Sequence, residues 1–115
     1  MSLRWSEGQY AAYVRRGQPA PVSEAAFMAA VVKIARQHTW LVYHTHNSKR
    51  SPEGFPDLIC ARAGSPLLAI ETKTDTGQVT PAQAAWLAAL GQCTGVVAEV
   101  WRPQDMEEIC RTLRQ

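Results

Sequence analysis

Two carboxylates and one ammonium group stand at the ends of apolar stretches in the middle of the chain. Asp57 follows the loop-like stretch "NSKRSPEGFP" and opens the short apolar run "DLICA". Glu71 and Lys73 close the run "LLAIETK", which otherwise has the composition of a buried strand. Carboxylate oxygens are hard ligands that suit Mg²⁺ or Mn²⁺, and a neighbouring lysine can stabilise the negative charge that develops when a phosphate ester is hydrolysed. These residue types therefore point to metal-assisted phosphodiester hydrolysis.

The spacing of these residues is compatible with one shared site. Side chains alternate along a strand, so Glu71 and Lys73 lie on the same face of theirs. If the two strands pair antiparallel through the turn "RAGSP", the start of one lies beside the end of the other. Asp57 would then lie next to Glu71 and Lys73. The same charges could instead form a plain surface ion pair, which contributes little free energy.

Two further polar residues belong to the apolar stripes of predicted helices. Glu24 lies on such a stripe in the first helical turn, where it could interact with the helix dipole or point into a site. Gln83 has the same placement on a later helix, where it could instead form a capping box with Thr80. Several elements that each direct a polar residue to one rim favour a functional site.

The predicted elements alternate in the way that an α/β domain requires. Helices are predicted over residues 6–16, 23–38, 80–90 and from 103 onward, and strands over 39–46, 57–61, 67–73 and 95–101. The helix over 80–90 is predicted to be the crossover between two parallel strands. This order predicts a small mixed sheet of about four strands flanked by helices. Residues 1–22 are predicted to form an N-terminal helical extension of the domain over residues 23–115, and the chain is predicted to be a single globular domain overall.

The composition leaves any binding of nucleic acid to local clusters of charge. The chain has 115 residues, of which 46% are apolar and 19% charged, and its net charge is only +2. One loop directly before Asp57 collects residue types that contact phosphate groups. They are His46, Asn47, Ser48, Lys49 and Arg50. The sequence is also compatible with a solvated polar loop at this place.

The cysteines and the hydropathy exclude several other classes of protein. Three widely spaced cysteines contain no CxxC pair, so neither a disulfide framework nor a zinc knuckle is indicated. A reducing cytoplasm is the simplest setting. No stretch approaches the ~20 apolar residues of a membrane span, and no membrane partner is expected.

The run "GFPDLI" followed by "LLAIETKTDTGQVTPAQAAWLAALG" resembles the virus-type replication-repair nuclease (VRR-NUC) family of the PD-(D/E)XK nuclease superfamily. Pro56-Asp57 and Glu71-Thr72-Lys73 match the superfamily motif. A Gly-x-Pro-Asp-Leu segment, a Glu-x-Lys strand, and a threonine and glutamine that open a helix match the family. The resemblance covers about Glu24 to Trp101.

This resemblance implies a restriction-endonuclease-like fold and assigns roles to the site residues. Asp57 and Glu71 would be metal ligands, with the main-chain carbonyl of Thr72 as a third. Lys73 would be the catalytic lysine, and Glu24 and Gln83 would support the site. The implied activity is that of an Mg²⁺- or Mn²⁺-dependent DNA endonuclease.

The small stand-alone members of the family are similar to Holliday-junction resolvases, which implies a preference for branched DNA in replication or repair. A four-way junction needs two cuts, so a symmetric homodimer is expected. Its interface could use Trp5, Tyr10, Tyr13 and Trp101, although these could equally close the core of the monomer. The alternatives are a non-catalytic nucleic-acid-binding or assembly protein on the same fold, and a sequence-specific, restriction-like nuclease.

Overall fold

The computed structural model describes residues 23–46 and 49–115. The helices of this part of the chain are α2 (Glu24–Gln37), α3 (Pro81–Gly91) and α4 (Met106–Arg114), with a short 3-10 helix, η1 (Pro103–Asp105), directly before α4. The strands are β1 (Leu41–His44), β2 (Leu58–Ala61), β3 (Leu67–Thr72) and β4 (Val96–Trp101). The predicted α/β class is confirmed. The helix predicted over residues 6–16 lies outside the described residues.

The four strands form one sheet in the order β1-β2-β3-β4. β1 pairs antiparallel with β2, and β2 pairs antiparallel with β3, with Leu58 opposite Ile70. β4 runs parallel to β3, and α3 is the crossover between them, as predicted. The register brings the start of β2 beside the end of β3, which is the juxtaposition that the site requires.

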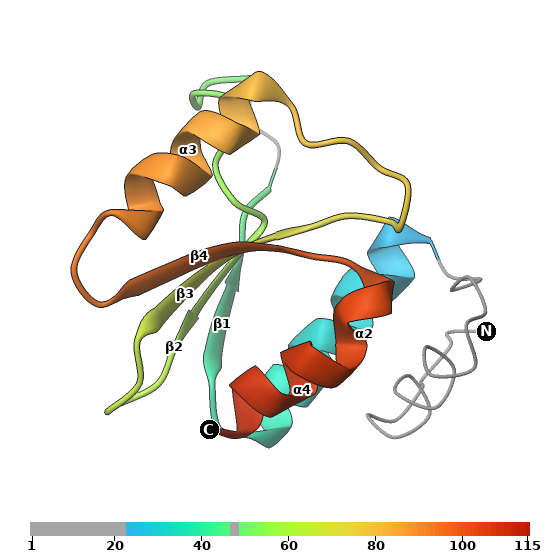
Figure 1. Ribbon diagram of the computed structural model, residues 1–115, viewed down its shortest axis with the longest axis vertical. Helices are drawn as coiled ribbons and strands as arrows, with labels where there is room; N and C mark the ends of the chain where they lie inside the picture. The colour runs from blue at the N-terminus through green and yellow to red at the C-terminus, as the bar shows by residue number, and fades with distance from the viewer. Residues whose placement is uncertain (1–22, 47–48) are drawn as a thin grey trace.

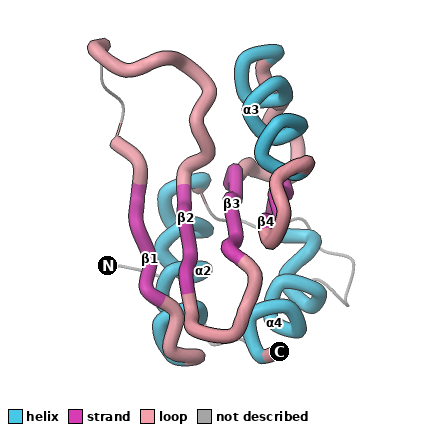
Figure 2. The backbone as a smooth tube through the Cα atoms, turned by 90° about the vertical axis from the view of Figure 1, so that its left-hand side faces the viewer, coloured by secondary structure: helices cyan, strands magenta, loops and turns pink. Residues whose placement is uncertain are grey.

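Helices cover the two faces of the sheet unequally. Figure 1 shows α2 and α4 side by side on one face and α3 alone on the other, and Figure 2 shows α3 beside β3 and β4 at the upper end of the sheet. The main core lies between the sheet and the α2–α4 pair. Its largest fully buried side chains are Phe27, Ile34, Leu58, Ile70, Met106, Ile109 and Leu113. In the part of the chain that the structure describes, no helix has the length and hydropathy that crossing a membrane requires.

β3 is the inner strand that its composition predicts. Every residue from Leu68 to Thr72 is buried, because helices lie on both faces of the sheet at this strand. Glu71 is therefore a carboxylate at the end of a strand that is otherwise fully buried. Lys73 is the first residue beyond the strand, and its backbone N–H donates to the Trp101 carbonyl at 3.0 Å, which continues the parallel ladder.

Several element boundaries differ from the prediction. The strand predicted over residues 39–46 is shorter, because Thr39 has a left-handed backbone with φ of 68° and turns the chain out of α2. The last helix begins as the 3-10 turn η1 before it becomes α4. On α2, Ala30 is buried with Phe27, Val31, Ile34 and Ala35, and Met28 is half-buried beside this stripe.

Candidate active site

Asp57 lies immediately before β2 and is held by the end of β3. Its Oδ2 accepts hydrogen bonds from the Thr72 backbone N–H and from the Thr72 hydroxyl, both at 3.0 Å. The predicted antiparallel pairing of the two strands is what brings these residues together. Two donors on one oxygen fix the orientation of the carboxylate at the rim of the sheet.

Glu71 is 2% exposed, and its two carboxylate oxygens have different surroundings. Oε2 accepts a hydrogen bond from Gln83 Nε2 at 3.0 Å and lies 3.5 Å from Lys73 Nζ. Oε1 is buried and has no hydrogen-bond partner among the described residues. Burial, followed by the nearby Asp57 carboxylate, raises the pKa of Glu71 to about 7, and Lys73 only partly offsets this rise. Additional positive charge beside Glu71 would therefore favour its ionised form.

Lys73 and Glu71 do not form the exposed surface ion pair that the sequence left open. The Lys73 side chain is 14% exposed and its partner carboxylate is almost fully buried. A charged pair at this depth loses hydration that must be compensated by good geometry or by a further charge. The pair is therefore a structural feature of the rim and not a solvated surface contact.

Gln83 forms the capping box of α3 and also contacts the buried Glu71 carboxylate. Its side-chain Oε1 accepts from the Thr80 N–H at 2.9 Å, and its own N–H donates to Thr80 Oγ1 at 3.1 Å, which completes the capping box of α3. With Oε1 engaged in the cap, the amide nitrogen faces Glu71 and donates to it. The cap thus orients the donor that holds the buried carboxylate.

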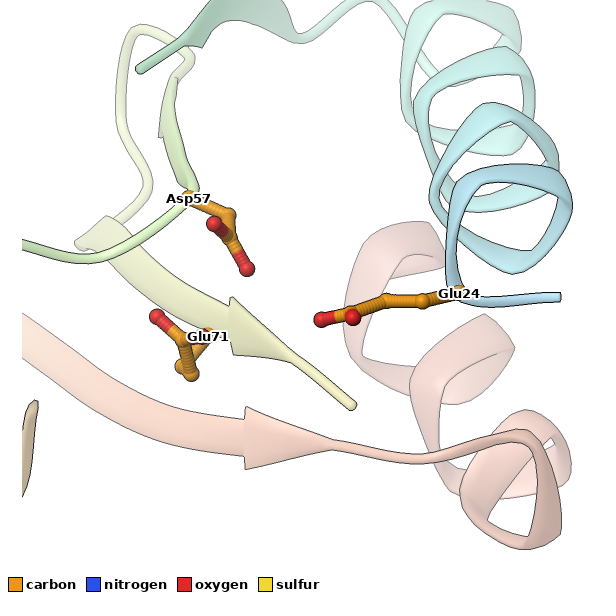
Figure 3. A group of neighbouring side chains, drawn as sticks. All are labelled: Glu24, Asp57 and Glu71. Carbon is orange, nitrogen blue, oxygen red and sulfur yellow. The ribbon is translucent and has the colours of Figure 1, made fainter. Parts of the chain in front are cut away.

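Glu24 reaches this site from α2, which lies on the face of the sheet opposite to α3. It is exposed in the first turn of α2, which Ser23 caps by accepting a hydrogen bond from the Ala26 N–H at 3.1 Å. One carboxylate oxygen from each of Glu24, Asp57 and Glu71 lies within 4.8 Å of the other two. Figure 3 shows the three side chains converging from α2, from the start of β2 and from β3.

The residues at this rim fit a hard divalent cation. Oxygen ligands lie about 2.0–2.6 Å from Mg²⁺ or Ca²⁺, so oxygens that share one ion are separated by less than about 5 Å. The convergence of the three carboxylates meets this distance requirement. Glu71 also keeps one buried oxygen, Oε1, without a hydrogen-bond partner among the described residues. Glu24 was predicted as a supporting residue, whereas the structure places its carboxylate with the two predicted ligands. The ligand role of the Thr72 carbonyl stays a prediction.

The loop before Asp57 is docked on the start of α3. Gly54 has φ of +96°, and a Cβ on it would lie 2.5 Å from the Ala82 carbonyl carbon. Trp86 Nε1 donates to the Glu53 carbonyl at 3.1 Å, and the Trp86 ring contacts the edge of Phe55 with the ring centroids 5.1 Å apart. The sequence assigned no role to Glu53, Phe55 or Trp86. The local signal was Gly54, the glycine of the Gly-x-Pro-Asp-Leu segment.

The predicted DNA-contacting loop is only partly described. His46, Lys49 and Arg50 are exposed, and Asn47 and Ser48 lie outside the described residues. The Thr45 N–H donates to the Asp57 carbonyl at 2.8 Å, so the chain enters this loop directly beside the carboxylate rim. The contacts of these residues with DNA stay a prediction.

Comparison with known proteins identifies the family. The VRR-NUC domain model matches residues 9–104. The chain belongs to the VRR-NUC family. The resemblance in the "GFPDLI" and "AIETK" segments is therefore confirmed, and with it a nuclease-type fold. The match begins before residue 23, and the predicted division into an extension and a nuclease domain stays a prediction.

A solved structure named "VRR_NUC domain protein" is also similar to this VRR-NUC chain. It has 23% sequence identity, covers 91% of this chain and 84% of its own, and superimposes with a TM-score of 0.47. Among curated proteins the comparison finds no match to the chain.

Proposed function

We propose that this VRR-NUC protein is an Mg²⁺- or Mn²⁺-dependent DNA endonuclease. The observation that carries the proposal is the buried Glu71 carboxylate, whose Oε1 lacks a hydrogen-bond partner and which groups with Asp57 and Glu24 beside Lys73. Leaving a buried carboxylate oxygen unsatisfied is costly, and functional sites are where such costs are retained. Membership of a nuclease family supports the same chemistry.

Each side chain has a distinct role in this proposal. A divalent cation, when bound, would supply Lewis acidity toward a phosphate oxygen and lower the pKa of a coordinated water. Asp57, Glu71 and Glu24 would hold it, with Asp57 fixed by Thr72. Gln83 orients Glu71 through its amide N–H. Lys73 places its ammonium where the phosphate gains negative charge and helps to orient the attacking water.

A cleavage assay tests the proposed activity. Supercoiled plasmid, single-stranded DNA and branched DNA should be cut in Mg²⁺ or Mn²⁺ and left intact in EDTA. Lys73→Ala should lower the cleavage rate by about 10² or more, because its charge acts mainly in the transition state. DNA affinity should change little in this variant.

Lys33→Ala is the matched control, because it removes an exposed lysine from the middle of α2. It should cleave at the wild-type rate. Two results would contradict the proposal: cleavage by Lys73→Ala at the wild-type rate, or no cleavage by the wild-type protein in Mg²⁺ and none in Mn²⁺. Either result would favour a non-catalytic nucleic-acid-binding or assembly protein.

We further propose that the working form is a homodimer that prefers branched DNA. The candidate site cuts one strand, whereas a four-way junction needs two cuts related by approximate two-fold symmetry. Trp101 takes no part in the interface, since it is 3% exposed and its indole N–H donates to Glu99 at 2.8 Å. The other aromatic residues predicted for the interface, Trp5, Tyr10 and Tyr13, lie outside the described residues.

The outer edge of β1 is the described surface that best suits a second copy. Leu41 and Tyr43 are 77% and 64% exposed, and β1 is an edge strand of the described sheet. An edge strand presents backbone N–H and C=O groups that a further strand can pair with. Two β1 strands related by a two-fold axis can pair antiparallel. This pairing would bury Leu41 and Tyr43 of each copy in the interface.

A further inference from the structure

The turn that follows Lys73 packs against the stem of this lysine. Residues 74–77 form a turn closed by a hydrogen bond from the Gly77 N–H to the Thr74 carbonyl at 3.3 Å. A Cβ placed on Gly77 would lie 3.5 Å from Lys73 Cδ and 3.0 Å from Thr74 Oγ1. The backbone at Gly77 is therefore in close range of the methylene chain that carries the ammonium group. The Lys73 side chain is only 14% exposed although it lies beyond the end of β3.

Arg102 holds both ends of this turn. Its Nη1 donates to the Thr74 carbonyl at 2.6 Å and to the Gly77 carbonyl at 2.7 Å. Arg102 follows β4 directly, and its own N–H donates to Asp105 Oδ2 at 3.0 Å, which fixes the backbone from which the side chain extends. A guanidinium presents its N–H groups in a rigid plane, so these two contacts define the position of the turn.

A second contact ties the same turn to the start of the last helix. Asp75 Oδ1 accepts a hydrogen bond from the Gln104 N–H at 3.0 Å, in the first turn of η1. The connection between β4 and α4 therefore holds residues 74–77 by hydrogen bonds from the Arg102 side chain and from the Gln104 backbone. None of these groups belongs to the carboxylate cluster.

We propose that Arg102 is a positioning residue for Lys73. It holds the turn against the lysine stem, and the turn keeps the ammonium beside Glu71. The inference rests on the proposed function only in so far as Lys73 is catalytic, because the positioning itself is a property of the folded chain. The competing role for a basic residue at this end of the molecule is a direct contact with a DNA phosphate.

Chemical labelling tests the positioning without reference to activity. The chain has three lysines, Lys33, Lys49 and Lys73. During limited acetylation in metal-free buffer, followed by peptide mass spectrometry, Lys73 should react more slowly than the exposed Lys33. In Arg102→Ala the ratio of Lys73 to Lys33 labelling should rise several-fold, because the turn no longer covers the stem. An unchanged ratio in a folded variant would overturn the proposal.

Matched variants separate positioning from loss of charge and from loss of stability. Arg111→Ala removes an exposed arginine of α4 that pairs with Glu108, and it should leave the labelling ratio at the wild-type value. Arg102→Lys retains a donor for the turn carbonyls and should restore part of the protection. If Arg102→Ala does not fold, Asp75→Ala releases the turn from Gln104 with Arg102 intact, and it should raise Lys73 labelling as well.

Kinetics separate positioning from contact with DNA. In Arg102→Ala, kcat for DNA cleavage should fall about tenfold or more, whereas KM and the salt dependence of DNA binding should stay near the wild-type values. A raised KM with unchanged kcat would assign Arg102 to phosphate binding and contradict the proposal. If the wild-type protein does not cleave DNA, the proposed function fails, but the labelling ratios still test the positioning.

Discussion

Glu71 lies at the end of the most buried strand, where Lys73 only partly offsets the free-energy cost of burying a charged carboxylate. The carboxylate is 2% exposed, and one of its oxygens has no partner among the described residues. A glutamine at the same position would fill the same volume without a charge to desolvate. The proposed metal site accounts for an acid at this position, because only the ionised form binds a cation.

The metal-free protein should lose stability as the pH rises from about 4.5 to about 7. The pKa of Glu71 is raised from 4.5 to about 7 by burial and by Asp57, so the folded protein holds this proton more tightly than the unfolded chain. The stabilisation is complete below pH 4.5 and is lost as the pH rises through the folded pKa. The loss should be on the order of 2–3 kcal/mol, measured by urea unfolding in EDTA at pH 5 and pH 8.

Glu71→Gln isolates the contribution of this one group. The variant has no titrating side chain at position 71, so its free energy of unfolding should change less between the two pH values than that of the wild type. Equal changes in the free energy of unfolding of the two proteins would mean that burial does not raise the pKa of Glu71.

At the scale of elements, the sequence predicted the parts of the fold that depend on local signals. Ser23 and Thr80 are the caps at which α2 and α3 begin, and the uninterrupted apolar run at β3 predicted an inner strand. The neighbourhood of Asp57 and Glu71 followed from the short turn between their strands, because a tight connection leaves antiparallel pairing as the simplest arrangement.

The contacts that position the site could not be predicted, because they join segments that are far apart in sequence. The hydrogen bonds from Arg102 to the turn after Lys73 depend on the path of the chain beyond the end of β4. The approach of Glu24 to the two predicted ligands depends on the angle at which α2 crosses the sheet. Helical periodicity places Glu24 on the correct stripe but gives no distance to another element.

Docking of the loop before Asp57 on α3 should be sensitive to a single methyl group. Gly54→Ala would place a Cβ within 2.5–2.6 Å of the Ala82 carbonyl group, at a backbone φ of +96° that alanine rarely adopts. We expect a loss of roughly 1–3 kcal/mol in the free energy of unfolding. Metal affinity should also fall, because the chain reaches Asp57 through this loop.

Gly64→Ala is the matched control for this prediction. Gly64 also has a positive φ, of +82°, but a Cβ there meets nothing within 4 Å. This variant bears the cost of the backbone conformation alone and should keep the wild-type metal affinity. Equal metal affinity in the two variants would mean that the loop does not position Asp57.

At the scale of the whole molecule, one face of the sheet is incompletely covered. α3 covers β3 and β4 of this face (Figures 1 and 2). Val42 packs against the core on the opposite face, so the exposed Leu41 and Tyr43, which alternate with it along β1, lie on the part that α3 leaves open. Leu41→Glu should convert the proposed dimer to a monomer, because a charge would be buried in the β1–β1 interface. Light scattering at micromolar concentration would measure the mass, and Glu107→Gln on the exposed face of α4 should leave the mass unchanged.

The same variant connects the oligomeric state to the choice of DNA. Wild-type protein should cut a four-way junction faster than linear duplex of equal length, and Leu41→Glu should lose this preference while retaining cleavage of linear duplex. A wild-type monomer that cuts both substrates at equal rates would contradict the dimer and leave a generic nuclease.

Titration with Mn²⁺ tests the central claim, that the carboxylate rim at the end of β3 is a metal site. Isothermal titration calorimetry should detect binding to the wild-type protein, and Asp57→Ala and Glu71→Ala should each abolish it. Glu107→Ala removes an exposed carboxylate of α4 and should bind Mn²⁺ as the wild type does. Mn²⁺ binding that is unchanged in both Asp57→Ala and Glu71→Ala would contradict the assignment of the site.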